Sequence, residues 1–257
     1  MAELSCFDLD GRVALVTGAG RGIGQSLAEA LARAGAAVAV TSRSLATLDE
    51  TRDRLVAVGA RTFAITHDVS TVAGCRSAVA ETAGQFGRLD ILINNAGVEQ
   101  VCTSLEVEEE LWDRIVDTNL KGAFFCAQAA AARMVEDGRG GAIINLCSLT
   151  SMVGVPTAVP YSASKTGLLG MTRALSAEWA PAGIRVNAIA PGYFRTAMTD
   201  IFFQDEAWQT KMLGRIPQGR FGTMADLQGV AVFLASDASA YITGQCIAVD
   251  GGFLASI

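Results

Sequence analysis

Seven short apolar runs alternate along the chain with longer stretches that have helical character. Most of these runs are continuously apolar, which is typical of strands buried on both faces of a parallel sheet. They span residues 12–18, 36–43, 62–69, 89–97, 141–148, 184–192 and 244–251. Gly35, Gly59 and Gly183 each follow a helical stretch, where glycine often ends a helix. The alternation predicts one α/β domain over residues 1–257, with a doubly wound, seven-stranded parallel sheet and helices on both faces.

The composition narrows the classes of protein to which the chain can belong. Hydrophobic residues make up 51% of the 257 residues, which is enough for a large core. The formal charge of −6 argues against binding to nucleic acid or to an anionic membrane. No apolar run is long enough to span a membrane, and the acidic beginning of the chain lacks the apolar region of a signal peptide. We therefore expect a cytoplasmic protein.

The six cysteines have no spacing that is typical of a metal site. None belongs to a CxxC pair, and several lie in apolar runs, where a free thiol acts as a small hydrophobic side chain. We expect reduced cysteines and no metal ion. The single histidine, His67, ends a predicted strand, and we expect it to be structural or to pack beside a ligand rather than to act in catalysis.

A glycine-rich turn, TGAGRGIG, joins the first predicted strand to the first predicted helix. Its glycines at positions 18, 22 and 24 allow a sharp turn and a close approach of the backbone to a pyrophosphate. The helix N-terminus that follows has unpaired N–H groups and favours negative charge. This strand–turn–helix context predicts a Rossmann fold that binds a dinucleotide.

The end of the second predicted strand indicates which nicotinamide dinucleotide is preferred. An acidic residue there binds the ribose 2′-hydroxyl of NAD, whereas arginine suits the 2′-phosphate of NADP. Ser42 stands where the acid is expected, Arg43 follows it, and Arg21 in the glycine turn is a second candidate cation. We predict NADP(H), with NAD(H) as the alternative if Arg43 is only a solvated loop residue.

Ser148, Tyr161 and Lys165 offer acid–base chemistry in a chain with one histidine. Tyr161 and Lys165 are four residues apart at the start of a predicted helix and share one face, and Ser148 ends the fifth predicted strand. Lowering a phenol pKa from about 10 to 7 takes about 4 kcal/mol, and one cation about 4 Å away supplies energy of that order. We expect Lys165 and an oxidised nicotinamide to lower the pKa of Tyr161, which transfers the proton while Ser148 binds the substrate oxygen. Ser151 is an alternative to Ser148.

Together these motifs resemble the short-chain dehydrogenase/reductase family over nearly the whole chain, through TGxxxGxG, NNAG, YxxxK and PGxxxT. The resemblance implies hydride transfer between a nicotinamide and a carbonyl or secondary alcohol, and a homotetramer or homodimer. It implies a catalytic tetrad of Asn119, Ser148, Tyr161 and Lys165. It implies cofactor contacts from Gly18, Arg21, Gly22, Ile23, Gly24, Ser42, Arg43, Asp68, Val69, Asn95, Ala96, Gly97, Tyr161, Lys165, Pro191, Gly192 and Thr196.

Two of the strand-end polar residues also have simpler interpretations. Asp68 can cap the helix that begins near Ser70, and Asn94 can stabilise the end of the sheet by bonding to backbone.

The substrate is predicted only by class. By the resemblance, segments 98–100, 149–156 and 193–217 form its pocket. Segment 193–217 is long for a connection and rich in apolar side chains, which favours a lid, although the same side chains suit packing onto the domain or a neighbouring subunit. The candidate substrate contacts are Glu99, Ser148, Tyr161 and Tyr193.

Three functional interpretations stay open at this point. Stretches near the C-terminus resemble the sugar-acid and polyol dehydrogenases of the family, such as gluconate 5-dehydrogenase, and the scaffold also serves 3-oxoacyl-[acyl-carrier protein] reductases. Those reductases dock an acidic carrier through basic residues; Arg139 is a candidate, but Ala182 replaces a second basic position. With the charge of −6, this favours a small hydroxylated substrate. The third interpretation is a non-catalytic, dinucleotide-binding regulator, which the intact tetrad disfavours.

Overall fold

The computed structural model describes residues 5–256, in which seven parallel strands form one sheet. The order of the strands is β3-β2-β1-β4-β5-β6-β7. Their bounds are β1 Val13–Val16, β2 Ala37–Ser42, β3 Thr62–Thr66, β4 Ile91–Asn94, β5 Gly141–Leu146, β6 Ile184–Pro191 and β7 Cys246–Val249. Each strand lies inside its predicted run, and the predicted fold class is confirmed.

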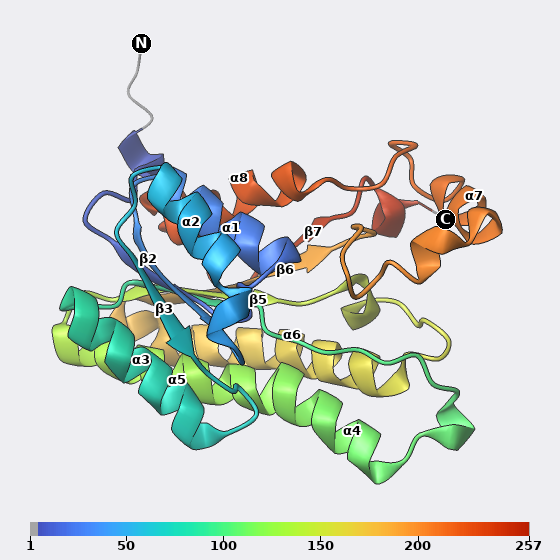
Figure 1. Cartoon of the computed structure of the whole chain (residues 1–257), viewed down its shortest axis with the longest axis horizontal. Helices are drawn as coiled ribbons and strands as arrows, with labels where there is room; N and C mark the ends of the chain where they lie inside the picture. Colours follow the sequence, from blue (N-terminus) through green and yellow to red (C-terminus); the bar gives the residue numbers. More distant parts are fainter. Residues whose placement is uncertain (1–4, 257) are drawn as a thin grey trace.

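Helices cover both faces of the sheet (Figure 1). On one face lie α1 (Gly22–Arg33), α2 (Asp49–Ala57) and α8 (Met224–Ala235). On the other face lie α3 (Val72–Phe86), α4 (Glu109–Val116), α5 (Gly122–Asp137) and α6 (Val159–Trp179). Successive strand residues point to opposite faces, so Ala14 and Val16 pack in one core layer, and Val13 and Leu15 in the other. This two-sided burial explains why the strand sequences are apolar throughout.

The order of the sheet reverses between β1 and β4, because β2 and β3 extend it on one side and β5, β6 and β7 on the other. Ligands of doubly wound sheets bind outside the carboxyl ends of the strands, near such a reversal. The glycine turn follows β1, and the segments after β4 and β5 begin beside it. The fold therefore directs most of the predicted site residues toward one edge of the sheet.

The connection between α4 and α5 is a π-helical turn, Asp117–Lys121, which was not predicted. Such turns widen the helix by one residue and are frequent at functional sites. This one carries Asn119, whose side chain is buried.

Segment 193–217 has structure of its own. It contains a 3₁₀ turn, Phe202–Gln204, and α7, Glu206–Leu213. Asp205 caps α7, because its carboxylate accepts hydrogen bonds from the N–H groups of Ala207 and Trp208.

Among residues 5–256, no helix combines the length and the apolarity that crossing a membrane requires.

Candidate active site

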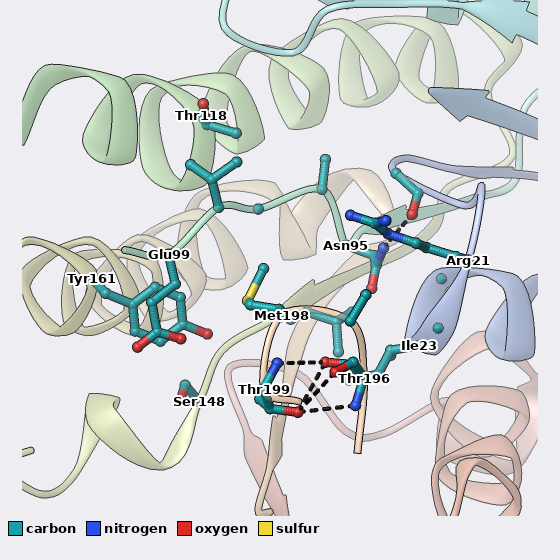
Figure 2. A pocket seen from close by; sticks show the side chains of 18 of the residues that line it. Arg21, Ile23, Asn95, Glu99, Thr118, Ser148, Tyr161, Thr196, Met198 and Thr199 are labelled. Carbon is teal, nitrogen blue, oxygen red and sulfur yellow. Dashed lines mark hydrogen bonds between the residues drawn. The ribbon is translucent and has the colours of Figure 1, made fainter. Parts of the chain in front are cut away.

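A cavity of about 850 Å³ opens at the carboxyl ends of the strands (Figure 2). Its wall comes from the glycine turn, the ends of β2 and β3, the segments after β4, β5 and β6, and one side of α6. Every predicted site residue except Asn119 belongs to the wall that the described chain forms. Its volume lies within the range of cofactor and small-molecule sites.

The glycine turn forms one end of the cavity and has little room for side chains. Gly18 has a φ of +64°, and a Cβ on it would lie 2.7 Å from the Cα of Ala96. A Cβ on Gly24 would overlap the side-chain amide of Asn95. At Gly18 and Gly24 the turn therefore exposes backbone that a ligand can approach closely.

α1 begins directly beyond this turn, at Gly22. Arg21 holds the N-cap position with extended backbone, and no side chain of the described residues caps the first N–H groups. These N–H groups and the helix dipole favour an anion. The turn and the helix N-terminus together fit the pyrophosphate of a dinucleotide.

Asn95 holds the glycine turn against the end of β4. Its side-chain amide donates hydrogen bonds to the carbonyls of Thr17 and Gly18, at 2.9 and 3.0 Å. The Thr17 hydroxyl in turn accepts from the N–H groups of Asn95 and Ala96, at 3.1 Å each. The predicted cofactor residue Asn95 thus shapes the turn as well as lining the cavity.

The end of β2 carries no carboxylate. The Ser42 hydroxyl instead bonds within the loop that follows, to the Ser44 carbonyl and to the Thr47 hydroxyl, each at 2.6 Å. Arg43 is exposed on the cavity wall and makes no hydrogen bond or ion pair within residues 5–256. A free guanidinium at this position is suited to a phosphate.

Asp68 lies near Arg43 at the same end of the cavity. A hydrogen bond from the Ser70 N–H lowers the pKa of Asp68, and the positive charge of Arg43 lowers it further. The interpretation of Asp68 as the cap of α3 is wrong, because Thr71 is the N-cap and accepts from the N–H of Gly74. Asp68 is exposed and lines the cavity.

The other end of the cavity brings together Tyr161, Ser148 and Glu99 (Figure 2). Tyr161 and Lys165 are one turn apart on α6, and the Lys165 Nζ lies 5.6 Å from the centre of the Tyr161 ring. The Lys165 Nζ also donates a hydrogen bond to the carbonyl of Leu146, at 2.6 Å. A phenol, a hydroxyl, an ammonium and a carboxylate therefore surround one reacting position.

In the chain alone, the pKa of Tyr161 lies above its usual value of 10. Burial raises this pKa most, the charge of Glu99 raises it further, and the Ser148 hydroxyl opposes the rise only in part. Burial also lowers the pKa of Lys165 to about 8. The predicted fall in this pKa depends on the charge of an oxidised nicotinamide as well as on Lys165, so it stays a prediction for the complex. In the chain alone, the raised pKa makes Tyr161 a neutral phenol at pH 7.

Asn119 lies behind the cavity wall. Its side-chain amide donates to the Val98 carbonyl at 2.9 Å and to the Ser164 hydroxyl at 3.2 Å, and it accepts from the Val98 N–H at 2.8 Å. A Cβ on Gly97 would be 3.2 Å from the Asn119 Oδ1 and 3.7 Å from the Lys165 Nζ. Asn119 is thus near Lys165 but positions the segment after β4 rather than facing the cavity.

Ser151 is not the serine of the site. Its hydroxyl is buried and donates to the carbonyl of Lys165 at 2.8 Å. It accepts a longer bond, of 3.4 Å, from the N–H of Ser148. In the cavity formed by residues 5–256, Ser148 lines the wall and Ser151 does not.

Comparison with known proteins agrees with this geometry. A family model described as enoyl-(acyl carrier protein) reductase matches residues 18–254. The chain is 43% identical to the 2-dehydro-3-deoxy-D-gluconate 5-dehydrogenase of Dickeya dadantii, over 98% of this chain and 99% of that protein. It is also 43% identical to the 3-oxoacyl-[acyl-carrier-protein] reductase FabG of Staphylococcus aureus, over 93% and 96% of the two chains.

The chain belongs to the short-chain dehydrogenase/reductase family. Among solved structures of the family, it is similar to a protein of Sinorhizobium meliloti named as a short-chain alcohol dehydrogenase candidate. That similarity has 64% identity and a TM-score of 0.96, over 98% of this chain and all of the other. A gluconate 5-dehydrogenase of Burkholderia cenocepacia, in complex with NADP and tartrate, is 39% identical with a TM-score of 0.95, over 99% of both chains.

Segments 149–156 and 193–217, which were predicted to form the substrate pocket, contribute further side chains to the wall. The wall near Tyr193 also includes Thr150, Val155, Met198, Phe202 and Trp208. The sequence identified segment 193–217 as apolar but did not indicate which of its side chains face the cavity.

Part of segment 193–217 packs inward, as the alternative interpretation predicted. Phe203 is buried, with its ring 4.7 Å from that of Phe221. Trp208 lines the cavity and also packs edge-on against Tyr193, with the ring centroids 5.3 Å apart. Ile201 is 66% exposed and does not line the cavity formed by the described residues.

Proposed function

We propose that the chain is an NADP(H)-dependent oxidoreductase that transfers a hydride between the nicotinamide and a carbonyl or secondary alcohol of a sugar acid or polyol. One observation carries the proposal. A single cavity has an anion-binding glycine turn at one end and Tyr161 with Ser148 at the other. The relatives named as sugar-acid dehydrogenases support the substrate class.

The cofactor preference rests on the end of β2. Arg43 and Arg21 are the cations available to a 2′-phosphate, and Ser42 leaves no carboxylate to repel it. Gly18, Gly22 and the N-terminus of α1 would hold the pyrophosphate. The Burkholderia relative was solved with NADP, which supports the same choice. When bound, the cofactor supplies the hydride chemistry, and the chain supplies orientation and proton transfer.

The neutral phenol of Tyr161 is the form that donates a proton to a carbonyl oxygen during reduction. Ser148 donates a hydrogen bond to the same oxygen and stabilises its developing charge. In the oxidative direction Tyr161 must first lose its proton, which burial opposes. Lys165, with a pKa of about 8, is mostly protonated at pH 7 and supplies positive charge beside the ring. Asn119 positions the neighbouring segment.

Glu99 suggests how the substrate lies. Burial raises the pKa of Glu99, and its charge acts on Tyr161 and Lys165. A substrate carboxylate placed beside Glu99 would be repelled, whereas substrate hydroxyls would donate to it. We propose that hydroxyl groups face Glu99, that Tyr193 contacts the substrate, and that a carboxylate, where present, points toward segment 193–217.

The reductase of acyl-carrier substrates is the second candidate, because the identity to the Staphylococcus protein is equally high. The position of Arg139 weakens it. Arg139 lies two residues before β5, at the amino ends of the strands, whereas the cavity opens at their carboxyl ends. Within one chain, Arg139 therefore does not flank the cavity, which counts against Arg139 as a candidate docking residue for a carrier.

The proposal also includes the domain organisation, the lid, the assembly and the location of the protein. Residues 1–257 form one domain, segment 193–217 closes over the substrate, the chain assembles as a homotetramer or homodimer, and it works in the cytoplasm. Light scattering on purified protein would determine the assembly. A regulator that binds the dinucleotide without turnover is the alternative of another class.

A panel of substrates with both cofactors tests the proposed function. Sugar acids, neutral polyols and a 3-oxoacyl thioester are each assayed with NADP(H) and NAD(H). We expect turnover of sugar acids or polyols, with a higher kcat/KM for the phosphorylated cofactor. Turnover of the thioester alone would favour the acyl reductase, and NADPH binding without any turnover would favour the regulator.

A further inference from the structure

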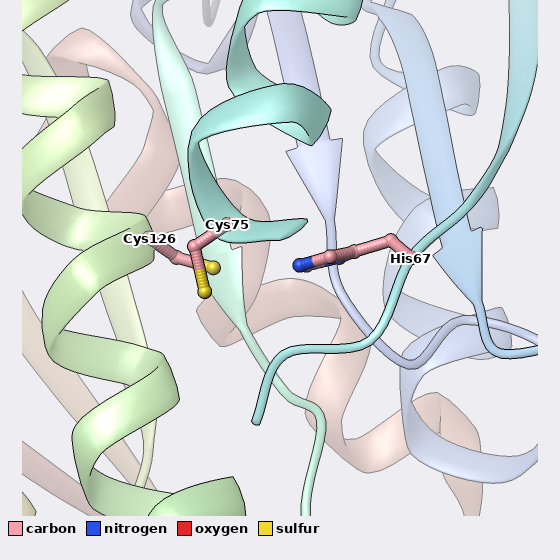
Figure 3. A group of neighbouring side chains, drawn as sticks. All are labelled: His67, Cys75 and Cys126. Carbon is pink, nitrogen blue, oxygen red and sulfur yellow. The ribbon is translucent and has the colours of Figure 1, made fainter. Parts of the chain in front are cut away.

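Three side chains that the proposed reaction does not use meet where the end of β3 lies beside α3 and α5 (Figure 3). His67 follows β3, Cys75 is on α3 and Cys126 is on α5. Their ligand atoms all lie within 4.8 Å of one another. His67 is 5% exposed, and the two cysteines are fully buried.

His67 points at the two thiols with a nitrogen that has no partner. Its Nδ1 pairs with the Thr41 hydroxyl at 3.1 Å. Its Nε2 is buried and has no hydrogen-bond partner within residues 5–256. A buried polar atom left unpaired costs about 1–3 kcal/mol, so such an atom requires an explanation. Figure 3 shows the imidazole directed toward the sulfur atoms of Cys75 and Cys126.

The hydrogen bonds of the Cys75 thiol go to backbone carbonyls rather than to this nitrogen. The single proton of the Cys75 thiol is shared between the carbonyls of Val69 and Gly122, which lie 3.3 and 3.5 Å from the sulfur. A thiol is a weak donor and a weak acceptor. A cation bound by the Nε2 and both sulfur atoms would satisfy all three groups at once.

We propose that His67, Cys75 and Cys126 form a binding site for one thiophilic divalent cation of the zinc type. Two soft thiolates and one neutral imidazole favour zinc or copper over magnesium or calcium. Two thiolate charges balance a divalent ion, whereas a monovalent ion would leave net charge in a buried place, which is unfavourable. This balance selects the divalent ion.

The observed spacing requires only a small closure. Zinc–sulfur and zinc–nitrogen bonds of about 2.3 and 2.0 Å place ligand atoms about 4 Å apart or less. The ligand atoms, which lie within 4.8 Å of one another, would therefore have to come closer by about 1 Å. Rotation of the cysteine side chains can supply this movement. The Val69 and Gly122 carbonyls next to Cys75 offer an oxygen for a fourth position.

The site would tie the cofactor end of the cavity to the helices below it. His67 and its partner Thr41 both line the cavity, and Asp68 is the next residue. Binding of the ion would join the end of β3 to α3 and α5. Because the unfolded chain holds the three ligands far apart, the ion would also stabilise the fold.

Metal binding to the untagged chain tests this proposal without any assay of turnover. The chain is stripped with a chelator under reducing conditions and titrated with Co²⁺, and then with Zn²⁺. We expect one ion per chain, thiolate-to-cobalt absorption that Zn²⁺ abolishes, and a Tm increase of about 5–10 °C when free Zn²⁺ exceeds its Kd about 100-fold.

Variants assign the ligands. Cys75→Ala and His67→Asn should lose the cobalt absorption and the Tm increase, whereas Cys147→Ala, which removes another buried free thiol, should keep both. Absence of stoichiometric binding to the reduced chain, or binding that survives Cys75→Ala, would overturn the proposal. The cobalt spectrum of the unaltered chain decides the matter even if a variant does not fold.

Discussion

The proposed dinucleotide end of the cavity is made of backbone, whereas the reacting end is made of side chains gathered from distant segments. At the first end, Gly18 and the N-terminus of α1 present N–H groups that no side chain of the described residues caps. At the second end, Tyr161 and Glu99 have pKa values that burial shifts. The backbone geometry of the first end requires a glycine motif that can be recognised in the sequence. The chemistry of the reacting end depends on burial and on neighbours from distant segments, which only the folded structure brings together.

Gly18→Ala should damage the backbone-built end most. The residue has a φ of +64°, and the added Cβ would lie 2.7 Å from the Cα of Ala96. Left-handed strain and overpacking together should lower the free energy of unfolding by about 2–5 kcal/mol. Urea denaturation measures this change.

Gly59→Ala is the matched control, since Gly59 has a φ of +78° and no described atom within 4 Å of its Cβ position. Strain alone should cost about 1–2 kcal/mol there. Equal losses for the two variants would mean that close packing at Gly18 is unimportant.

Lys165→Met should change how stability depends on pH. The pKa of Lys165 is about 8 in the folded chain, against 10.5 for an unperturbed lysine. Between these values the unfolded chain binds more protons than the folded chain, so this lysine makes stability rise with pH. Because of this lysine, the free energy of unfolding increases by at most about 1.4 kcal/mol per pH unit, and by on the order of 3 kcal/mol in total.

The free energy of unfolding is measured from pH 8 to 10.5 for both proteins. We expect Lys165→Met to be more stable than the unaltered chain at pH 8, and this difference in stability to become smaller as the pH rises. The exposed Lys121→Met is the control and should follow the unaltered chain. A constant difference between Lys165→Met and the unaltered chain would contradict the burial of a charged lysine at this position.

Arg43→Ala tests the cofactor choice at the backbone-built end. Loss of charge-assisted hydrogen bonds to a 2′-phosphate should raise the Kd of NADPH about 10- to 100-fold and leave that of NADH nearly unchanged. Arg52→Ala, an exposed arginine on α2, is the control. Equal weakening of both nucleotides would show that Arg43 does not recognise the phosphate.

Glu99→Gln should have the smallest effect, and it acts at the side-chain-built end. Removing the charge should lower the KM of an anionic sugar acid roughly 2- to 5-fold, in the range of partly exposed ion interactions, and should not lower that of a neutral polyol. Glu110→Gln, on the exposed face of α4, is the control. Equal changes in KM for the sugar acid and the polyol would show that Glu99 does not discriminate between charged and neutral substrates.

Much of the fold and of the dinucleotide end could be predicted from the sequence. Buried parallel strands must be apolar throughout, and the turn needs glycine where the backbone approaches the ligand, so both produce recognisable local patterns in the sequence. The pairing of Tyr161 with Lys165 could be predicted as well, because a helix fixes which residues share a face.

The rest depends on three-dimensional burial. The upward shift of the Tyr161 pKa comes from loss of hydration and from Glu99, which lies in a different segment. Asn119 lies behind the cavity wall because it is part of a π-helical turn, which the hydrophobic periodicity of the sequence did not predict. Cys75 and Cys126 meet only because α3 packs against α5, so their spacing along the chain resembles no metal motif.

Tyr161→Phe tests the central claim most directly, because the variant keeps the ring and removes only the proton carrier. Turnover of the best substrate with NADPH or NADP⁺ is measured beside the Kd of NADPH. The account predicts a fall in kcat of about 100-fold or more with the Kd nearly unchanged. Turnover close to that of the unaltered chain would contradict it, because another group would then be carrying the proton.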